Sequence, residues 1–289
     1  METRVSSATK VVLISDQRPT VLIGERINPT GKKRLAAALQ AGDMELICQE
    51  ALAQVHAGAD ILDVNVGVPD TDQVALLPQA VQAVMDTVDV PLCLDSDSPA
   101  ALEAAIKVYR GKPIINSVTG QERSLEEILP LVKEYGTVVM GLTLDDGGIP
   151  NDSERRVAIA HKIVERAEAL NIPREDIIID CLTLTVGADS RAGLVTIEAI
   201  RRVKAELGVN LSLGVSNISF GLPDRDLLNS AFLAILIAAG VTCPIVDVAK
   251  ARSTVLAADL VLGDDKSAMH YIRAYRQQQL VTKQGFSQS

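Results

Sequence analysis

The stretch that decides the fold lies at residues 61–67 and reads ILDVNVG. It is a run of apolar, partly β-branched residues that leads into polar side chains and a glycine, a pattern typical of buried parallel strands. Similar apolar runs occur along the whole chain and make eight candidate strands. These are Val21–Glu25, Ile61–Val66, Pro91–Ser96, Pro113–Val118, Thr137–Thr143, Ile177–Leu182, Leu211–Asn217 and Cys243–Val248.

Helical segments separate these strands. Helical periodicity is clearest over Met44–Ala57, Ser124–Tyr135 and Ser153–Leu170, and a glycine often follows such a segment, as at Gly58 and Gly136. Eight strand–helix repeats predict an α/β fold, the closed (β/α)8 TIM barrel. A doubly wound open sheet is the alternative, but the GxGxxG turn expected after its first strand is missing.

No internal linker interrupts the repeats, so residues 1–289 are predicted to form a single barrel domain. Residues 1–18 are a mixed polar lead-in, interpreted as a small hairpin that closes the bottom of the barrel. Residues 276–289 are rich in Gln and Ser and are expected to be a frayed tail.

Composition excludes several classes of function. Aromatic residues make up 2% of the chain and the net charge is −9, so neither base stacking nor attraction to a polyanion supports a nucleic-acid partner. The longest apolar run, Ala231–Gly240, is too short to span a membrane, and no signal peptide opens the chain, so a cytoplasmic protein is expected. The four widely spaced cysteines are interpreted as reduced thiols.

Polar residues gather where the strands end, which is where barrels place their function. Asp63 and Asn65 are two residues apart and therefore face the same way on a strand. Asp95, Asn116 and Asp180 end three further strands. Asp accepts hydrogen bonds and Asn both donates and accepts, so such a ring matches the edge of a heterocycle with several N–H donors and a carbonyl, such as a pterin or a guanine.

The same residue types also suit helix caps, a metal site or a phosphate site. Single polar residues at strand ends commonly cap helices, and Asp63, Asp95 and Asp180 have the oxygen ligands for a hard cation. Zinc is not expected, because the three histidines have no ligand spacing. A sugar-phosphate site is weakly supported, since the loops after the last two strands are not rich in glycine.

Seven ordered motifs carry a resemblance to a known family. They are Leu22–Asn28 (LIGERIN), Leu62–Gly67 (LDVNVG), Leu92–Ser96 (LCLDS), Ile115–Ser117 (INS), a loop with Gly141–Thr143 (GLT) and Gly148–Pro150 (GIP), Ile179–Asp180, and Leu213–Asn217 (LGVSN). In this order they resemble the methyltetrahydrofolate-binding methyltransferases. That family includes the methyltetrahydrofolate:corrinoid protein methyltransferases of acetogens and the folate module of cobalamin-dependent methionine synthase.

The resemblance implies a pterin-binding TIM barrel and a set of site residues. Asp95, Asn116 and Asp180 would hold the pterin, with Asp63 and Asn217 close by. Asn65 and Ser96 are expected to support this pterin-binding group.

Catalysis is expected to depend on Asn217 and Asp63. A tertiary amine is a poor leaving group, so N5 of methyltetrahydrofolate must gain positive character before its methyl group leaves. Asn217 would stabilise protonated N5 through its amide oxygen, and a proton network would end at Asp63.

The resemblance also implies partners. The chain has neither a cobalamin-binding Asp-x-His-x-x-Gly signature nor a Cys-rich zinc module, so a separate corrinoid protein would carry the cobalamin and dock over the barrel mouth. The family is commonly homodimeric, and Leu227–Gly240, which is apolar almost all round, is expected to be buried in the barrel wall or at a subunit contact. Arg26, Lys32 and Lys33 are weak candidates for binding the glutamate tail of the folate.

Three functions remain open from the sequence alone. The first is methyl transfer between tetrahydrofolate and a corrinoid protein, in either direction. The second is a dihydropteroate synthase-like enzyme, although the basic residue expected near the end of its seventh strand is missing at Ser216–Ser219. The third is a folate-binding barrel without catalytic activity.

Overall fold

Eight parallel strands form the centre of the computed structural model, which describes residues 1–276. In chain order they are β3 (Ile23–Ile27), β4 (Ile61–Asn65), β5 (Leu92–Asp95), β6 (Ile114–Thr119), β7 (Val138–Leu142), β8 (Ile177–Asp180), β9 (Asn210–Ser212) and β10 (Ile245–Val246). β10 pairs with β3, and a parallel bridge between Gly214 and Ile245 brings β9 and β10 together. The predicted (β/α)8 barrel is confirmed.

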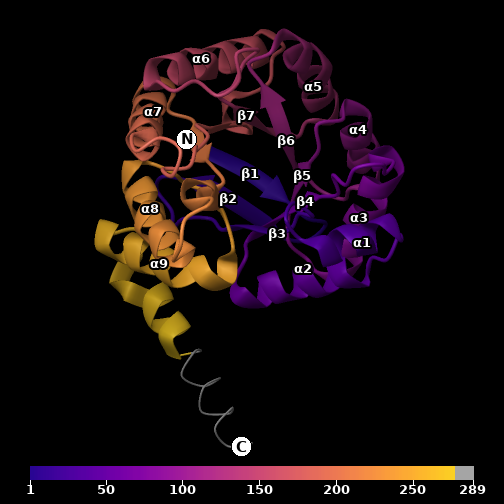
Figure 1. Ribbon diagram of the computed structural model, residues 1–289, viewed down its shortest axis with the longest axis horizontal. Helices are drawn as coiled ribbons and strands as arrows, with labels where there is room; N and C mark the ends of the chain where they lie inside the picture. The colour runs from indigo at the N-terminus through magenta and orange to yellow at the C-terminus, as the bar shows by residue number, and fades with distance from the viewer. Residues whose placement is uncertain (277–289) are drawn as a thin grey trace, which may run out of the picture.

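A ring of helices surrounds these strands (Figure 1). They are α1 (Lys33–Gln40), α2 (Glu45–Ala57), α3 (Gln73–Thr87), α4 (Pro99–Val108), α5 (Glu122–Tyr135), α6 (Ser153–Ala169), α7 (Ala192–Leu207), α8 (Arg225–Ala239) and α9 (Val248–Leu262). Short 3-10 helices occur at η1 (Arg174–Asp176), η2 (Val215–Ser219) and η3 (Lys266–Ala268).

Local sequence signals set the helix ends. Asp72 and Asp152 cap α3 and α6, where their carboxylates accept hydrogen bonds from the first free backbone N–H groups. Gly58, Gly136 and Gly208 end α2, α5 and α7 in the left-handed conformation, with φ of 101°, 62° and 68°. The helices therefore begin and end close to the predicted positions.

Two apolar layers make the core. The larger one lies between the outer face of the strands and the helices. The smaller one fills the barrel itself with Ile23, Ile61, Cys93, Ile114, Val138, Met140, Ile178, Cys243 and Ile245. Side chains therefore pack the barrel interior, and only the two ends of the barrel are left to be covered.

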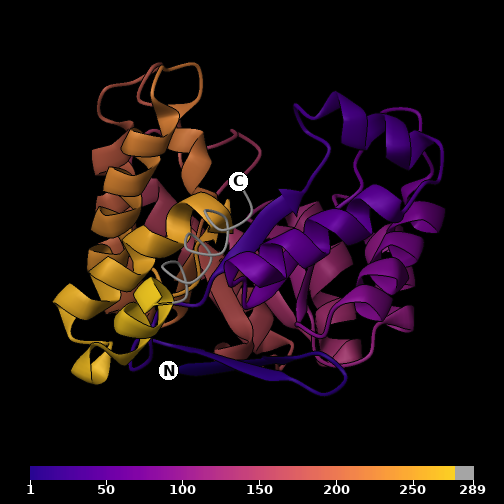
Figure 2. The same cartoon turned by 90° about the horizontal axis from the view of Figure 1, so that it is seen from below.

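An antiparallel hairpin covers one of these ends. The strands β1 (Glu2–Ser6) and β2 (Val11–Ser15) cross the amino end of the barrel, and Val5 and Ile14 pack into the interior layer (Figure 2). The hairpin expected in residues 1–18 is thus present. The tail expected at residues 276–289 lies outside the described residues, apart from Arg276.

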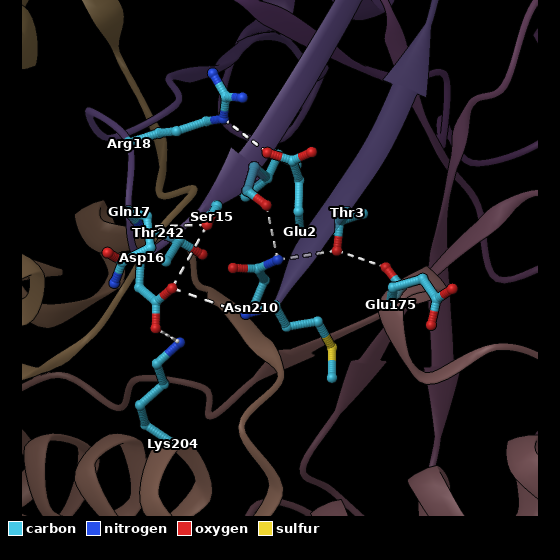
Figure 3. Close-up of polar contacts among 12 residues, drawn as sticks. Glu2, Thr3, Ser15, Asp16, Gln17, Arg18, Glu175, Lys204, Asn210 and Thr242 are labelled. Atoms are coloured by element: carbon cyan, nitrogen blue, oxygen red, sulfur yellow. Dashed lines mark hydrogen bonds and ion pairs between the residues drawn. The ribbon is translucent and has the colours of Figure 1, made fainter.

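Polar contacts attach this hairpin to the barrel wall (Figure 3). The Asn210 side chain donates from Nδ2 to Thr3 Oγ1 and to the Ile14 carbonyl, both at 2.9 Å. Asp16 forms an ion pair with Lys204 of α7 at 3.0 Å. The amino end is therefore closed by groups of the chain itself.

Two predicted strands are shorter than expected. The predicted strand Leu211–Asn217 is wrong in its second half, since β9 ends at Ser212 and η2 follows. The cause lies in β8, which ends at Asp180; Leu182 then turns with φ of 57°, so pairing with β8 stops at Ser212 and only the bridge from Gly214 to Ile245 continues on the other side. The predicted strand Cys243–Val248 is reduced to β10, because Asp247 already begins α9.

The structure also describes the state of the four cysteines. Cys93, Cys181 and Cys243 are buried free thiols, and Cys48 is half-buried and also free. None of the helices within residues 1–276 has the length and apolar character needed to cross a membrane.

Candidate active site

The carboxyl end of the barrel, called the mouth below, collects the polar strand ends. Asn65, Asp95 and Asn116 are register partners on β4, β5 and β6, so their side chains point the same way. Asp63 lies two residues before Asn65 and two after Ile61, which faces the barrel interior. These four side chains therefore all face inward at the mouth.

Hydrogen bonds join the four residues in pairs. Asn116 Nδ2 donates to Asp63 Oδ1 at 3.2 Å, and Asn65 Nδ2 donates to Asp95 Oδ2 at 2.8 Å. Asn65 Oδ1 accepts from the Gly67 N–H at 2.7 Å, which fixes the amide orientation. The Cys93 thiol also lies close to the Asp63 carboxylate, whereas Asp95 has Asn65 as its side-chain partner and keeps an oxygen available to a ligand.

Asp180 lies at the same end of the barrel on β8. It is buried, and Oδ1 accepts a hydrogen bond from the Leu182 N–H at 2.6 Å. The left-handed turn at Leu182 directs this N–H back to the carboxylate. Asp180 therefore has a fixed position, and the Gly214 backbone N–H, which also lies close to the carboxylate, lowers its pKa.

Asn217 is placed differently from the strand-end prediction. It lies in η2, is exposed, and its amide makes no hydrogen bond to any described residue. A Cβ on Gly214 would lie 3.2 Å from Asn217 Nδ2, so the amide folds back over the end of β9. This free amide beside the barrel mouth suits contact with a ligand.

Ser96 is engaged elsewhere. Its hydroxyl donates to Gln73 Oε1 at 2.9 Å and accepts from the Ser98 N–H at 3.1 Å. Because it follows Asp95 on the chain, it points away from the inward-facing group. The structure therefore places Ser96 where it holds the loop after β5 against α3.

Burial dominates the electrostatics of the mouth. Burial raises the pKa of Asp95 to about 6 and that of Asp180 to about 7. Burial and the nearby charge of Asp95 together raise the pKa of Asp63 well above its usual range. Three carboxyl groups with raised pKa values share the mouth, and N–H donors of a ligand would favour their charged forms.

Arg156 is a supporting residue that the sequence analysis missed. This fully buried side chain on α6 donates to the carbonyls of Pro150, Cys181 and Leu182 at 2.8, 3.0 and 2.9 Å. It thereby fixes the backbone just after Asp180. Its spacing in the sequence could have indicated burial, because Arg156 lies four residues before the buried Ala160 on the apolar face of α6.

Glu25 is the second residue that was missed. It lies on β3 where the pairing with β4 shifts register, and Ser216 Oγ donates to its Oε2 at 3.3 Å, so its carboxylate points towards η2 at the mouth. Burial raises its pKa. The polar strand end at Glu25–Asn28 was the only sequence signal.

The cations suggested for the folate tail are largely occupied. Arg26 pairs with Glu50 at 3.4 Å and with Asp247 at 3.8 Å, and Lys32 Nζ donates to the Arg26 carbonyl at 2.7 Å. Lys33 is exposed in the first turn of α1. Within the described part of the chain, no cluster of three or more His, Cys, Asp or Glu side chains is arranged to hold a metal ion.

Known sequences identify the relatives of this chain. The family described as "Pterin binding enzyme" matches residues 24–247. The chain is 30% identical over 267 residues to the methylcorrinoid:tetrahydrofolate methyltransferase of Eubacterium limosum, covering 89% of this chain and 96% of that protein. It is 33% identical over 262 residues to the methionine synthase of Mycobacterium tuberculosis, covering 86% of this chain but only 22% of that longer protein.

Solved structures agree on the fold. A dihydropteroate synthase of Yersinia pestis with a pterine-sulfa conjugate has a TM-score of 0.69 at 15% identity, covering 90% of this chain and 99% of that one. The dihydropteroate synthase of Thermus thermophilus in complex with 6HMPPP has a TM-score of 0.65 at 20% identity, covering 87% and 97%. At such identities the likeness concerns the fold alone, whereas the sequence relatives that cover most of this chain are methyltransferases. The chain therefore belongs to the pterin-binding enzyme family, among its folate- and corrinoid-dependent methyltransferases.

Proposed function

We propose that this enzyme moves a methyl group between N5 of tetrahydrofolate and the cobalt of a separate corrinoid protein. The observation that carries the proposal is the mouth itself, where the buried carboxyl groups of Asp63 and Asp180 and the half-buried one of Asp95 lie at the same end of the barrel as the free amide of Asn217. The relative from Eubacterium limosum is named for transfer from a methylcorrinoid to tetrahydrofolate, which supports transfer towards tetrahydrofolate in this enzyme.

The carboxylates suit the donor edge of a pterin. Asp95 and Asp180 accept hydrogen bonds from ring N–H and amino groups, and such charge-assisted bonds are the stronger ones. Asn116, held by Asp63, offers a donor and an acceptor to the same edge. Asn65 orients Asp95 through their 2.8 Å hydrogen bond.

Asn217 acts on N5 in this proposal. An amide does not ionise, but its oxygen stabilises the positive charge on N5 that exists while the methyl group is transferred. Because the amide has no partner within residues 1–276, it can turn to N5 without breaking a hydrogen bond. Asp63 lies two positions before Asn65 on the same face of β4, so its carboxyl group belongs to the same inward-facing group.

The rim of the mouth provides a surface for the corrinoid protein. Cobalt and N5 must both contact the same methyl group, so the partner has to land beside Asn217. There Phe220 is 68% exposed, Leu194 of α7 is 65% exposed and Leu227 of α8 is 65% exposed. The Val186 N–H donates to the Ile218 carbonyl at 3.0 Å, which ties the two loops of this apolar rim together.

A second apolar surface, on the outside of α8 and α9, suits a second copy of the chain. Ile235, Val261 and Leu262 are 47%, 85% and 46% exposed, and small side chains line the hollow between the two helices. Charged residues are absent from this lining, as in homodimer contacts. A homodimer is therefore proposed, and Val261→Glu should give a monomer in sedimentation experiments.

The test is methyl transfer in both directions. The purified enzyme is mixed with methylcobalamin and tetrahydrofolate, or with cob(I)alamin and methyltetrahydrofolate, and the cobalt absorbance is followed. Enzyme-dependent exchange is expected, and the faster direction at equal saturation identifies the preferred one. If folate binds but no exchange occurs, even with a corrinoid protein, the transferase proposal fails; a p-aminobenzoate condensation assay then separates a synthase from a barrel that only binds.

A further inference from the structure

Methyl transfer raises a question of proton balance that Asn217 cannot answer. Tetrahydrofolate carries a proton on N5 that methyltetrahydrofolate lacks, so one proton must leave or arrive in each turnover. An amide does not titrate at neutral pH. A corrinoid protein seated on the rim also separates N5 from bulk water, so the proton needs another route through the barrel wall.

Glu25 is the carboxyl group placed to serve such a route. It faces the mouth from β3, and its Oε2 accepts from Ser216 Oγ at 3.3 Å, one residue before Asn217. Its charge also contributes to raising the pKa of Asp63, so the two carboxylates are electrostatic neighbours. Glu25 therefore contacts the residue next to Asn217 and is close enough to Asp63 to affect its pKa.

A small cavity connects Glu25 with the outside. It has a volume of about 40 Å³ and lies between η2, α8, α9 and the ends of β3 and β10. Glu25 and Ser216 line it, together with Asp226 and Lys250, which form a 3.0 Å ion pair that is more than half exposed. A cavity of this size has room for a few water molecules, and the polar side chains of Glu25, Ser216 and Asp247 among its largely apolar lining give them partners for relaying protons.

We infer that Glu25 exchanges the N5 proton with solvent through this cavity. In the direction towards tetrahydrofolate, the N5 lone pair forms the bond to the methyl carbon and the cobalt–carbon electron pair stays on cobalt. The N5 proton passes across the Ser216 hydroxyl to the Glu25 carboxylate and leaves by way of the cavity. In the other direction, protonated Glu25 supplies the proton to N5 before the methyl group departs.

The surroundings of Glu25 allow it both protonation states. Burial raises its pKa and Asp247 adds to this, whereas the hydrogen bond from Ser216 and the charges of Lys32 and Arg26 lower it. Asp247 lies at the start of α9, Ser216 in η2, Lys32 just before α1 and Arg26 on β3. Asp63 is the nearest carboxyl group on the neighbouring strand β4. A carboxyl with a raised pKa is suited to proton transfer near neutral pH.

This inference rests on the proposed function, and Glu25→Gln tests it. The amide can still accept from Ser216 but cannot carry the proton. We expect kcat to fall on the order of 10²-fold in both directions, while the Kd for the folate changes less than about threefold. In the wild type, kcat should rise with pH towards tetrahydrofolate and fall with pH in reverse; both slopes should flatten in the variant.

Two further variants make the result decisive. Glu50→Gln removes another carboxylate near β3, one that pairs with Arg26 outside the mouth, and should leave kcat and both slopes unchanged. Glu25→Asp keeps an ionisable group and should retain the slopes at a reduced rate, which also decides the matter if Glu25→Gln does not fold. Wild-type rate and slopes in Glu25→Gln, or lost slopes in Glu25→Asp, would overturn the role of Glu25. A wild type without any transfer would overturn the proposed function instead.

Discussion

The two ends of the barrel treat buried polar groups in opposite ways. At the amino end, Thr3, Asp16 and the amide nitrogen of Asn210 find their partners within the chain, and the hairpin covers them (Figure 3). Asn210 Oδ1 is buried there without a partner among the described residues. At the mouth, Asp180 is buried and Asp95 is half-buried, and desolvation raises their pKa values to about 7 and about 6. The fold satisfies most polar groups at the amino end, whereas the carboxyl groups at the mouth depend on a ligand for donors that favour their charged forms.

Polar groups at the amino end of the barrel therefore serve stability, whereas those at the mouth serve ligand binding. A buried charge without an opposite charge destabilises the folded state, because the folded protein solvates it less well than water does. The mouth tolerates that cost because donors of the ligand can offset it on binding. Substitutions at the two ends should therefore have opposite consequences.

The largest effect is expected at Asn217. Asn217→Ala removes the amide that stabilises charge on N5, so kcat should fall on the order of 10²-fold, about 3 kcal/mol. The folate Kd, measured by isothermal titration, should change only a few-fold, because the carboxylates still hold the ring. Unchanged turnover would show that Asn217 does not act on N5.

A smaller but clear effect on binding is expected from the carboxylates. Asp180→Asn and Asp95→Asn each lose a charge-assisted hydrogen bond, so the folate Kd should rise roughly 10- to 100-fold. Asp180→Asn should also raise the Tm of the ligand-free protein at pH 8 by a few degrees, since it removes a buried charge. Normal folate binding by both variants would show that the ring lies elsewhere.

Lowering the pH should weaken folate binding less than these substitutions do. The folate Kd should rise about tenfold as the pH falls from 7.5 to 5.5, because Asp180 and then Asp95 become protonated near about 7 and about 6. The stability of the ligand-free protein should change in the opposite sense. Since the folded-state pKa values are raised, the folded state binds more protons, and stability rises as the pH falls over the same window. In Asp180→Asn the rise of the Kd between pH 7.5 and 6.5 should be lost while the part due to Asp95 near pH 6 remains; an unchanged pH dependence in this variant would contradict the assignment to Asp180.

The smallest effect on activity is expected at the amino end. Asn210→Ala leaves the Ile14 carbonyl without its donor and should lower stability by about 1–3 kcal/mol, seen as a lower Tm. Arg18→Ala, which breaks an exposed ion pair with Glu2, is the matched control and should cost less than about 1 kcal/mol. Both variants should keep kcat within twofold. A large loss of kcat in Asn210→Ala would mean that the two ends are coupled.

Periodic features of this fold could be predicted from the sequence. The eight apolar runs, the glycines that end helices, and the spacing of Asp63 and Asn65 all follow from local geometry, and the structure has them in the expected places. The resemblance then led to the same family that the sequence relatives establish.

Features that depend on distant partners could not be predicted. The apolar run from Leu211 continues through Val215, so nothing local shows that the pairing of β9 with β8 stops at Ser212. Arg156 resembles its exposed neighbour Arg155 in sequence, and only the carbonyls after β8 make it a buried support. The site roles of Asp95, Asn116, Asp180 and Asn217 remain predictions for the experiments above.

The hairpin at the amino end also has a consequence for biosynthesis. Thr3 and Asn210 are 207 positions apart, so during synthesis the hairpin cannot complete its contacts until the residues up to β9 have left the ribosome. Contacts of such long sequence separation slow folding, because a long loop must close first. We therefore expect β1 and β2 to dock late in folding. The amino end of the barrel should stay uncovered in the nascent chain until β9 has left the ribosome.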